Sequence, residues 1–127
     1  MTDGIEAITT KAVALALDAA SLRHRAIATN VANVSTVGYV PQRVNFEAQL
    51  ADARRNLRER GTLDNLTLDA VRLQIEPVID SAGLPAKVQL DEEMAGMAQN
   101  TLQYQALIKA LSRHMSVLTS AISEGKK

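Results

Sequence analysis

Side chains that could act as metal ligands, acids or nucleophiles are few and scattered in this 127-residue chain. His24 and His114 are its two imidazoles, and neither has a second ligand at metal-binding spacing. Glu92 and Glu93 are adjacent, so on a helix their carboxylates point in different directions and form no acid–base pair. Cysteine is absent, and there is no phosphate-binding glycine loop or nucleophile elbow. We therefore expect no enzyme activity, no metal and no cofactor.

Four arginines fall within seven residues and could grip phosphate groups: Arg54, Arg55, Arg58 and Arg60. Asp52 and Glu59 dilute this cluster, and no aromatic residue is interleaved for base stacking. The pattern favours the solvated face of a polar helix over residues 47–60 that ends at Gly61, or a face that pairs with a neighbour's acids.

The composition argues against several classes of partner. Fourteen basic and fourteen acidic residues cancel, so no net charge attracts nucleic acid or an anionic membrane. No run approaches the roughly 18 apolar residues of a membrane span, and the N-terminus lacks the pattern of a cleaved secretory signal. Aromatic residues make up only 2% of the chain, and the other apolar residues are typical of helical bundles. We expect no nucleic-acid partner and no membrane insertion.

Residues 3–34 are predicted to form one long helix with two apolar stripes, each with alternating steps of three and four residues. The first stripe, rich in alanine, comprises Ile8, Ala12, Leu15, Ala19, Leu22 and Ala26. The second stripe comprises Val13, Leu17, Ala20, His24, Ile27, Val31 and Val34. The two stripes lie roughly 150° apart around the helix, so we expect this helix to be buried between partners.

Residues 91–124 are predicted to form a second long helix with a bulkier stripe of the same period. Its members are Met94, Met97, Tyr104, Ile108, Leu111, Met115, Leu118 and Ile122. We expect this stripe, methionines included, to pack on the alanine-rich stripe as an antiparallel coiled-coil pair within the chain. The second stripe of residues 3–34 is then assigned to contacts with other subunits. An unusually apolar helix in a monomeric bundle is the alternative.

The chain is predicted to be a single all-α domain, residues 1–127, in which residues 35–90 connect the two helices. The first helix ends in a polar segment in which Gly38 can adopt a positive φ and Pro41 prevents further helix. Either an ordinary helix stop or a turn that presents Tyr39 at a contact explains this segment. Residues 44–46 can continue as a short extended piece. One β-hairpin around residues 81–83, or a loop, is predicted within residues 62–89.

Two segments resemble motifs of bacterial flagellar axial proteins. Residues 30–39 resemble the N-x-A-N-x-x-T-x-G-Y signature of rod and hook proteins, through Asn30, Asn33, Thr36, Gly38 and Tyr39. Residues 88–105 resemble the C-terminal segment of the FlgB family of proximal rod proteins, through Asp91, Asn100, Tyr104 and Gln105. The sequence departs from the family at Val37, where proline is usual, and at Gln89, where an acidic residue is typical.

The resemblance implies a structural subunit of the flagellar basal-body rod, not an enzyme. Members of this family are exported without a cleaved signal through the flagellar type III apparatus and assemble through their terminal helices. The implied partners are other rod subunits, copies of the chain itself, the ring and adaptor protein at the rod base, and the export gate. The implied location is the periplasm-spanning rod. Residues 46–50 are similar to an export-recognition pattern. The alternative function is a free-standing helical module that binds and regulates a partner.

Overall fold

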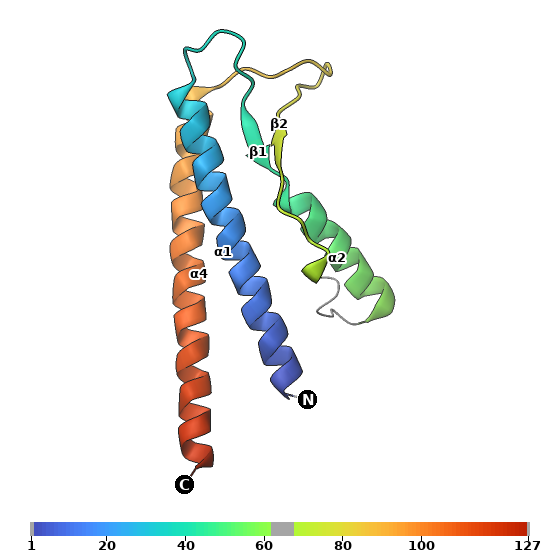
Figure 1. The fold of residues 1–127 in the computed structure, drawn as a ribbon, viewed down its shortest axis with the longest axis vertical. Coiled ribbons are helices and arrows are strands. Elements are labelled where there is room, and N and C mark those ends of the chain that lie inside the picture. Colours follow the sequence, from blue (N-terminus) through green and yellow to red (C-terminus); the bar gives the residue numbers. More distant parts are fainter. Residues whose placement is uncertain (1, 62–67, 127) are drawn as a thin grey trace.

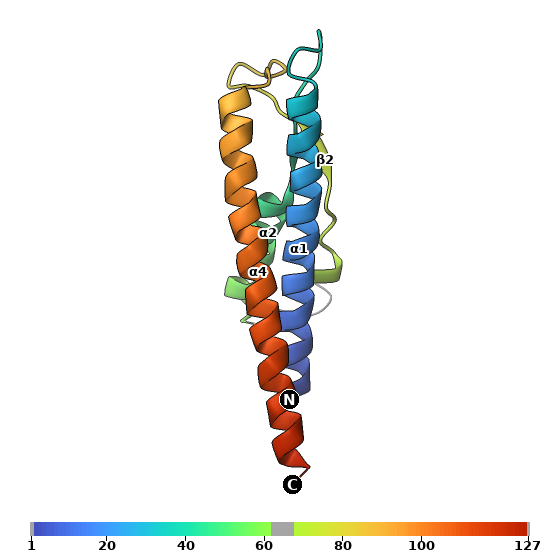
Figure 2. The same cartoon turned by 90° about the vertical axis from the view of Figure 1, so that its left-hand side faces the viewer.

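The two long helices dominate the fold. The computed structural model describes residues 2–61 and 68–126. Helix α1 (Thr2–Ala32) and helix α4 (Leu90–Gly125) run antiparallel, so both chain termini lie at the same end of the molecule (Figure 1, Figure 2). The predicted all-α fold with packed terminal helices is confirmed. Both helices begin and end within two residues of the predicted bounds, 3–34 and 91–124.

Helix α1 is long because its interior lacks proline and is rich in the strong helix formers alanine and leucine. Asn33 closes its last turn, where both its backbone N–H and its side-chain amide donate to the Thr29 carbonyl, at 3.1 and 2.8 Å. Gly38 then takes a φ of 78°, a conformation that few other residues adopt. The predicted end of the helix and the positive φ of Gly38 are thus both present.

The connecting segment contains β1 (Gln42–Val44), α2 (Phe46–Arg60) and β2 (Ile75–Pro77). The polar helix predicted over residues 47–60 is confirmed as α2, and Gly61 follows it with a φ of 70°. The extended piece predicted over residues 44–46 is displaced: the strand ends at Val44, and Phe46 already begins α2.

The two strands pair antiparallel across the connecting segment, with Val44 opposite Ile75 and Gln42 opposite Pro77. The sequence predicted a hairpin within residues 62–89, so the long-range partner of β2 was missed. A smaller hairpin does surround residues 81–83, where Ile79 bridges Pro85. Part of the region predicted as extended, residues 62–67, lies outside the described residues.

The core is made of small side chains. Among the described residues, and leaving proline aside, the buried apolar ones are Ala19, Ala20, Ala26, Ile27, Val44, Ala53, Leu68 and Val71. Helix α1 lies between α4 on one side and the connecting segment on the other (Figure 1). Ion pairs link α1 to the connecting segment: Lys11 pairs with Asp69, and Arg23 pairs with Glu47.

Candidate interaction surface

The side of α1 that contacts α4 carries Ala20 and Ile27. The side-chain amide of Asn100, on α4, donates a hydrogen bond of 2.8 Å to the Ala20 carbonyl. Gly96 of α4 faces Ile27, since a Cβ at position 96 would lie 3.7 Å from Ile27 Cδ1, an ordinary van der Waals distance. Both α1 residues belong to the stripe that the heptad pattern assigned to other subunits. The structure corrects that assignment for these two positions.

The alanine-rich stripe faces the connecting segment instead. At about 100° per residue, Ala19 and Ala26 share a side of α1 with Asn30, and Asn30 binds Gln42 of β1. Both alanines are buried, at 1% and 2% exposure. The two stripes have the same spacing, and alanine lets either a strand or a helix pack closely against α1. The spacing alone therefore could not show which stripe packs against which element. Helix α1 is covered on two sides, as predicted, but its own chain supplies both covers.

The bulky stripe of α4 is only partly covered by α1. Five of its eight predicted members are 41–61% exposed: Met94, Tyr104, Ile108, Met115 and Ile122. The side of α4 turned toward α1 is centred on Asn100, which is 3% exposed. Half-buried Leu107 lies on the same side, as do half-buried Leu111 and Leu118, two members of the predicted stripe that do face α1. A polar residue at the centre of the contact explains why the apolar pattern placed the seam too far around the helix.

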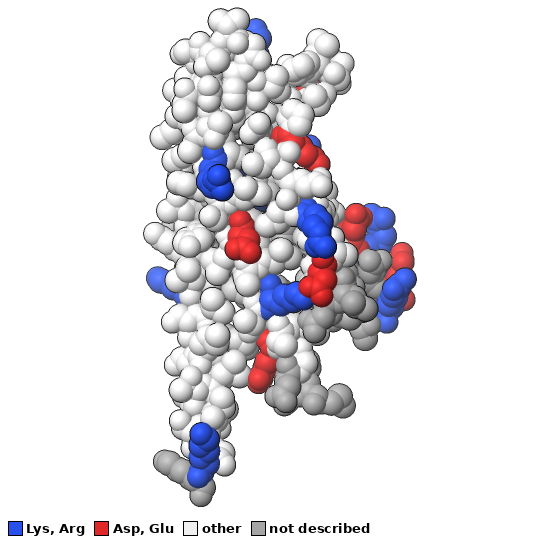
Figure 3. Space-filling view, in the orientation of Figure 1, with Lys and Arg blue, Asp and Glu red and all other residues white. Residues whose placement is uncertain are grey.

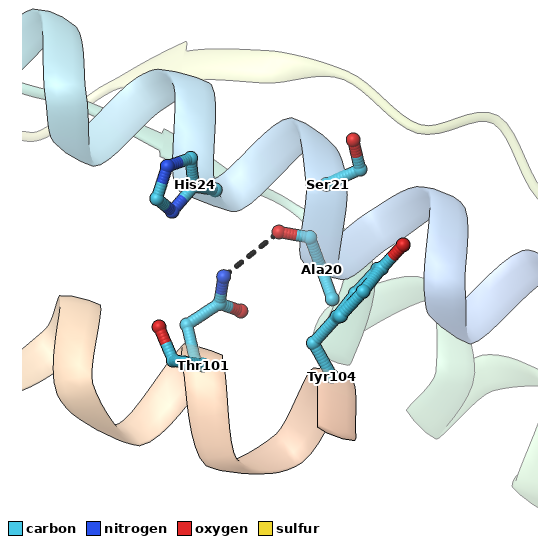
Figure 4. A pocket seen from close by; sticks show the side chains of 6 residues that line it. Ala20, Ser21, His24, Thr101 and Tyr104 are labelled. Atoms are coloured by element: carbon cyan, nitrogen blue, oxygen red, sulfur yellow. Dashed lines mark hydrogen bonds between the residues drawn. The ribbon is translucent and has the colours of Figure 1, made fainter. Parts of the chain in front are cut away.

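A groove runs between α1 and α4 on the side away from the connecting segment. Its volume is about 300 Å³, and its lining residues are Ala20, Ser21, His24, Asn100, Thr101 and Tyr104. Figure 4 shows His24 on α1 and Tyr104 on α4 pointing into the space between the two helices. No carboxylate is among these lining residues to orient His24, so they do not form a catalytic set. The groove has the character of a contact surface.

Charged residues are unevenly distributed over the molecule. In Figure 3, most of the visible acidic and basic side chains lie over the connecting segment and the part of α1 beside it. The α4 side of this view is mostly uncharged. Between Met94 and Ser123, helix α4 carries two charged residues, Lys109 and Arg113, together with a line of exposed apolar side chains. Exposed apolar surface of this kind is typical of interaction sites.

The turn motif of residues 30–39 is held together by its own polar side chains. Thr36 Oγ1 donates to Asn33 Oδ1 at 3.1 Å, and the Tyr39 hydroxyl donates to Asn30 Oδ1 at 2.7 Å. Tyr39 is therefore half-buried and directed inward, whereas Val37 is fully exposed at the tip. Within this chain, the contact that Tyr39 makes through its hydroxyl is the one to Asn30.

Asn30 is at the centre of this motif and is 1% exposed. Its Oδ1 also accepts the Gln42 N–H at 2.9 Å, and its amide donates to the Gln42 carbonyl at 2.9 Å and to Glu93 Oε1 at 3.1 Å. One side chain thus joins α1, the turn, β1 and α4. Burial, and secondly the charge of Glu93, raise the pKa of Tyr39 above its ordinary value.

The C-terminal motif divides between buried and exposed positions. Asn100 is buried against α1, and Tyr104 borders the groove. Asp91 and Gln105 are exposed. Asp91 lies in the first turn of α4, where an acidic residue is favourable beside the helix N-terminus.

The arginine cluster and the other candidate sites considered from the sequence form no binding site among the described residues. Arg54, Arg55 and Arg58 are exposed on α2, and Arg55 pairs with Asp52 at 3.3 Å. Within residues 2–61 and 68–126, no group of acidic or histidine side chains could hold a metal ion. None of the helices in those ranges has the length and apolarity to cross a membrane.

Arg23 is a residue that the sequence patterns missed. It lies between the two apolar stripes of α1, pairs with Glu47 of α2, and donates to Asn100 Oδ1 and Gln103 Oε1 of α4 at 3.5 and 3.4 Å. Arg23 thereby links α2 to α4 across α1. The sequence shows only that Arg23 is a charged residue among apolar neighbours on the helix. That pattern does not reveal which distant residues Arg23 contacts.

The relatives found by comparison with known proteins all carry the same name. The chain is 30% identical to the flagellar basal body rod protein FlgB of Borrelia hermsii, over 84% of this chain and 89% of the relative. It is 27% identical to FlgB of Bacillus subtilis (strain 168), over 87% and 90%, and 24% identical to FlgB of Escherichia coli (strain K12), over 87% and 89%. No family model matches the chain.

Proposed function

The chain belongs to the family of FlgB flagellar basal body rod proteins, and we propose that it joins its neighbours through the exposed apolar side of the α1–α4 pair. It is a structural component of the basal-body rod and not an enzyme. The proposal concerns which surface of the subunit makes the contacts.

The observation that carries this proposal is the line of exposed apolar residues on α4. Tyr104, Ile108 and Met115 are 41–47% exposed although they recur at helical spacing along one side. Burying such side chains against another chain contributes about 25 cal/mol per Å² of apolar surface. His24, a member of the stripe predicted for intersubunit contacts, is also exposed and borders the same groove as Tyr104, so it extends this surface onto α1.

We also infer that the chain passes unfolded through the flagellar type III apparatus. A small core supports this inference, because the buried apolar side chains of the described residues are half alanine. Other rod subunits, copies of the chain itself and the ring and adaptor at the rod base are the partners expected from the family resemblance.

The test is a charge placed in the exposed line. Ile108→Glu should leave the isolated subunit folded, because the side chain is 43% exposed, but should prevent its incorporation into the rod. The matched control is Ser120→Glu, an exposed position about 120° away around α4. Each variant is expressed as the only copy in the host bacterium, and isolated basal bodies are probed for it alongside a motility assay.

Normal incorporation and motility of Ile108→Glu would show that this surface is not the assembly contact. A stable monomer that Ile108→Glu leaves unchanged, with no rod defect, would favour the free-standing helical module instead.

A further inference from the structure

The apolar contacts between α1 and α4 do not by themselves select one axial alignment of the two helices. On α1, Val13, Ala20 and Ile27 follow one another at intervals of seven residues. On α4, Leu107 follows Asn100 at the same interval, and leucines continue along this side. Sliding one helix by seven residues, about 10 Å, would again place apolar side chains against apolar side chains.

Two buried amides distinguish the observed alignment, and we propose that Asn30 and Asn100 fix the axial register of the α1–α4 pair. They are the buried polar residues among those described, at 1% and 3% exposure. The proposal concerns contacts within one subunit and does not depend on the proposed assembly surface.

Asn100 binds α1 at a position where the backbone is accessible. Its amide reaches the Ala20 carbonyl at 2.8 Å because the Ala20 side chain is a single methyl group. One heptad away in either direction the same side of α1 carries Val13 or Ile27, whose branched side chains obstruct a carbonyl. After a slide, the Asn100 amide would be buried without this acceptor, which is costly for a polar group.

Asn30 gives the second fixed point. It donates to Glu93 of α4 at 3.1 Å while its remaining bonds hold Gln42 and Tyr39 of the same chain. The turn and β1 are held by Asn30, so Asn30 cannot follow α4 when the helices slide. Moving Glu93 along α1 therefore breaks the hydrogen bond between the Asn30 amide and Glu93. Buried asparagines set register in paired helices in the same way.

Cross-linking can read the register directly, because the chain has no cysteine. The pair Ile27→Cys and Gly96→Cys reports the observed alignment, in which Ile27 Cδ1 lies 3.7 Å from a Cβ at position 96. The pairs Ile27→Cys with Gln103→Cys, and Val13→Cys with Gln103→Cys, report a slide by one heptad in each direction and leave Ala20 unchanged. Each pair is introduced into the full-length chain and treated with a short bifunctional thiol reagent.

With both asparagines present, only the first pair should cross-link efficiently. Replacing both by leucine should raise the ratio of shifted to native cross-link by about tenfold, the effect of losing one or two net hydrogen bonds. Gln105→Leu is the matched control, because it converts an exposed amide on the same helix to leucine and should leave the ratio unchanged.

Far-ultraviolet circular dichroism checks that the helices persist in each variant. If the double variant loses helix, Asn100→Leu alone, which keeps the Asn30 contacts, decides the question. Helical variants whose cross-linking remains confined to positions 27 and 96 would overturn the proposal.

Discussion

The Tyr39 hydroxyl and the Asn30 side-chain oxygen lie 2.7 Å apart, and this hydrogen bond folds the turn back onto α1. The same oxygen accepts the Gln42 N–H, and the Asn30 amide reaches Glu93 on α4. The turn motif therefore stabilises the junction at which both long helices and the sheet meet.

Tyr39→Phe should lower the free energy of unfolding by about 1 kcal/mol, because it removes one half-buried hydrogen bond and keeps the ring. Urea unfolding followed by circular dichroism measures this difference. Tyr104→Phe is the control, since the Tyr104 hydroxyl has no hydrogen-bond partner among the described residues, and it should have no effect. Equal losses in both variants would contradict the role given to the Tyr39 hydroxyl.

Stability should also fall at alkaline pH because of Tyr39. Burial, and secondly the Glu93 charge, raise its folded pKa above the ordinary 10.0. A raised pKa means that the neutral phenol stabilises the fold, fully below pH 10 and progressively less as pH rises through the folded pKa. Tyr39→Phe should lack this alkaline loss. In Tyr104→Phe, phenolate absorbance reports Tyr39 alone, and titration at or below the ordinary value would contradict the prediction.

Gly38→Ala should cost about 1 kcal/mol, because an L-residue at a φ of 78° is strained. A Cβ there would meet no atom within 4 Å, so the cost arises from the backbone and not from a clash. Gly4→Ala is the matched control: it lies in α1 with open space around it and should instead stabilise by about 0.5 kcal/mol. Thermal unfolding of the two variants should move in opposite directions.

Gly96→Ala should stabilise the chain by about 1 kcal/mol, although Gly96 faces another helix. The added Cβ would make an ordinary contact with Ile27 Cδ1 at 3.7 Å, and alanine favours the helix. Gly96→Leu should destabilise by about 2 kcal/mol, because its larger side chain forces the helices apart. A loss of stability in Gly96→Ala would show that α1 and α4 are closer here than the structure gives.

Elements whose signals are local were predictable from the sequence. The long helices follow from uninterrupted heptad spacing, and α2 from the polar run that ends at Gly61. The positive φ of Gly38 followed from the need to turn the chain before Pro41. Each of these depends on neighbouring residues only.

Relationships between distant residues were not predictable. Ala19 and Ala20 are adjacent and differ in no local property, yet they face different partners. The pairing of Val44 with Ile75 depends on how the connecting segment folds over α1, which no short-range pattern encodes. Asn30 could be singled out by its motif, but its bond to Glu93 could not be read from spacing.

The small side chains of the core also determine how the subunit responds to temperature. Half of the buried apolar residues that the structure describes are alanines, so unfolding exposes little new apolar surface. The heat capacity of unfolding, which follows that surface, should be low for a chain of this length. The curve of the free energy of unfolding against temperature should therefore bend less than for a domain of this length with a larger core, which moves cold unfolding to lower temperature.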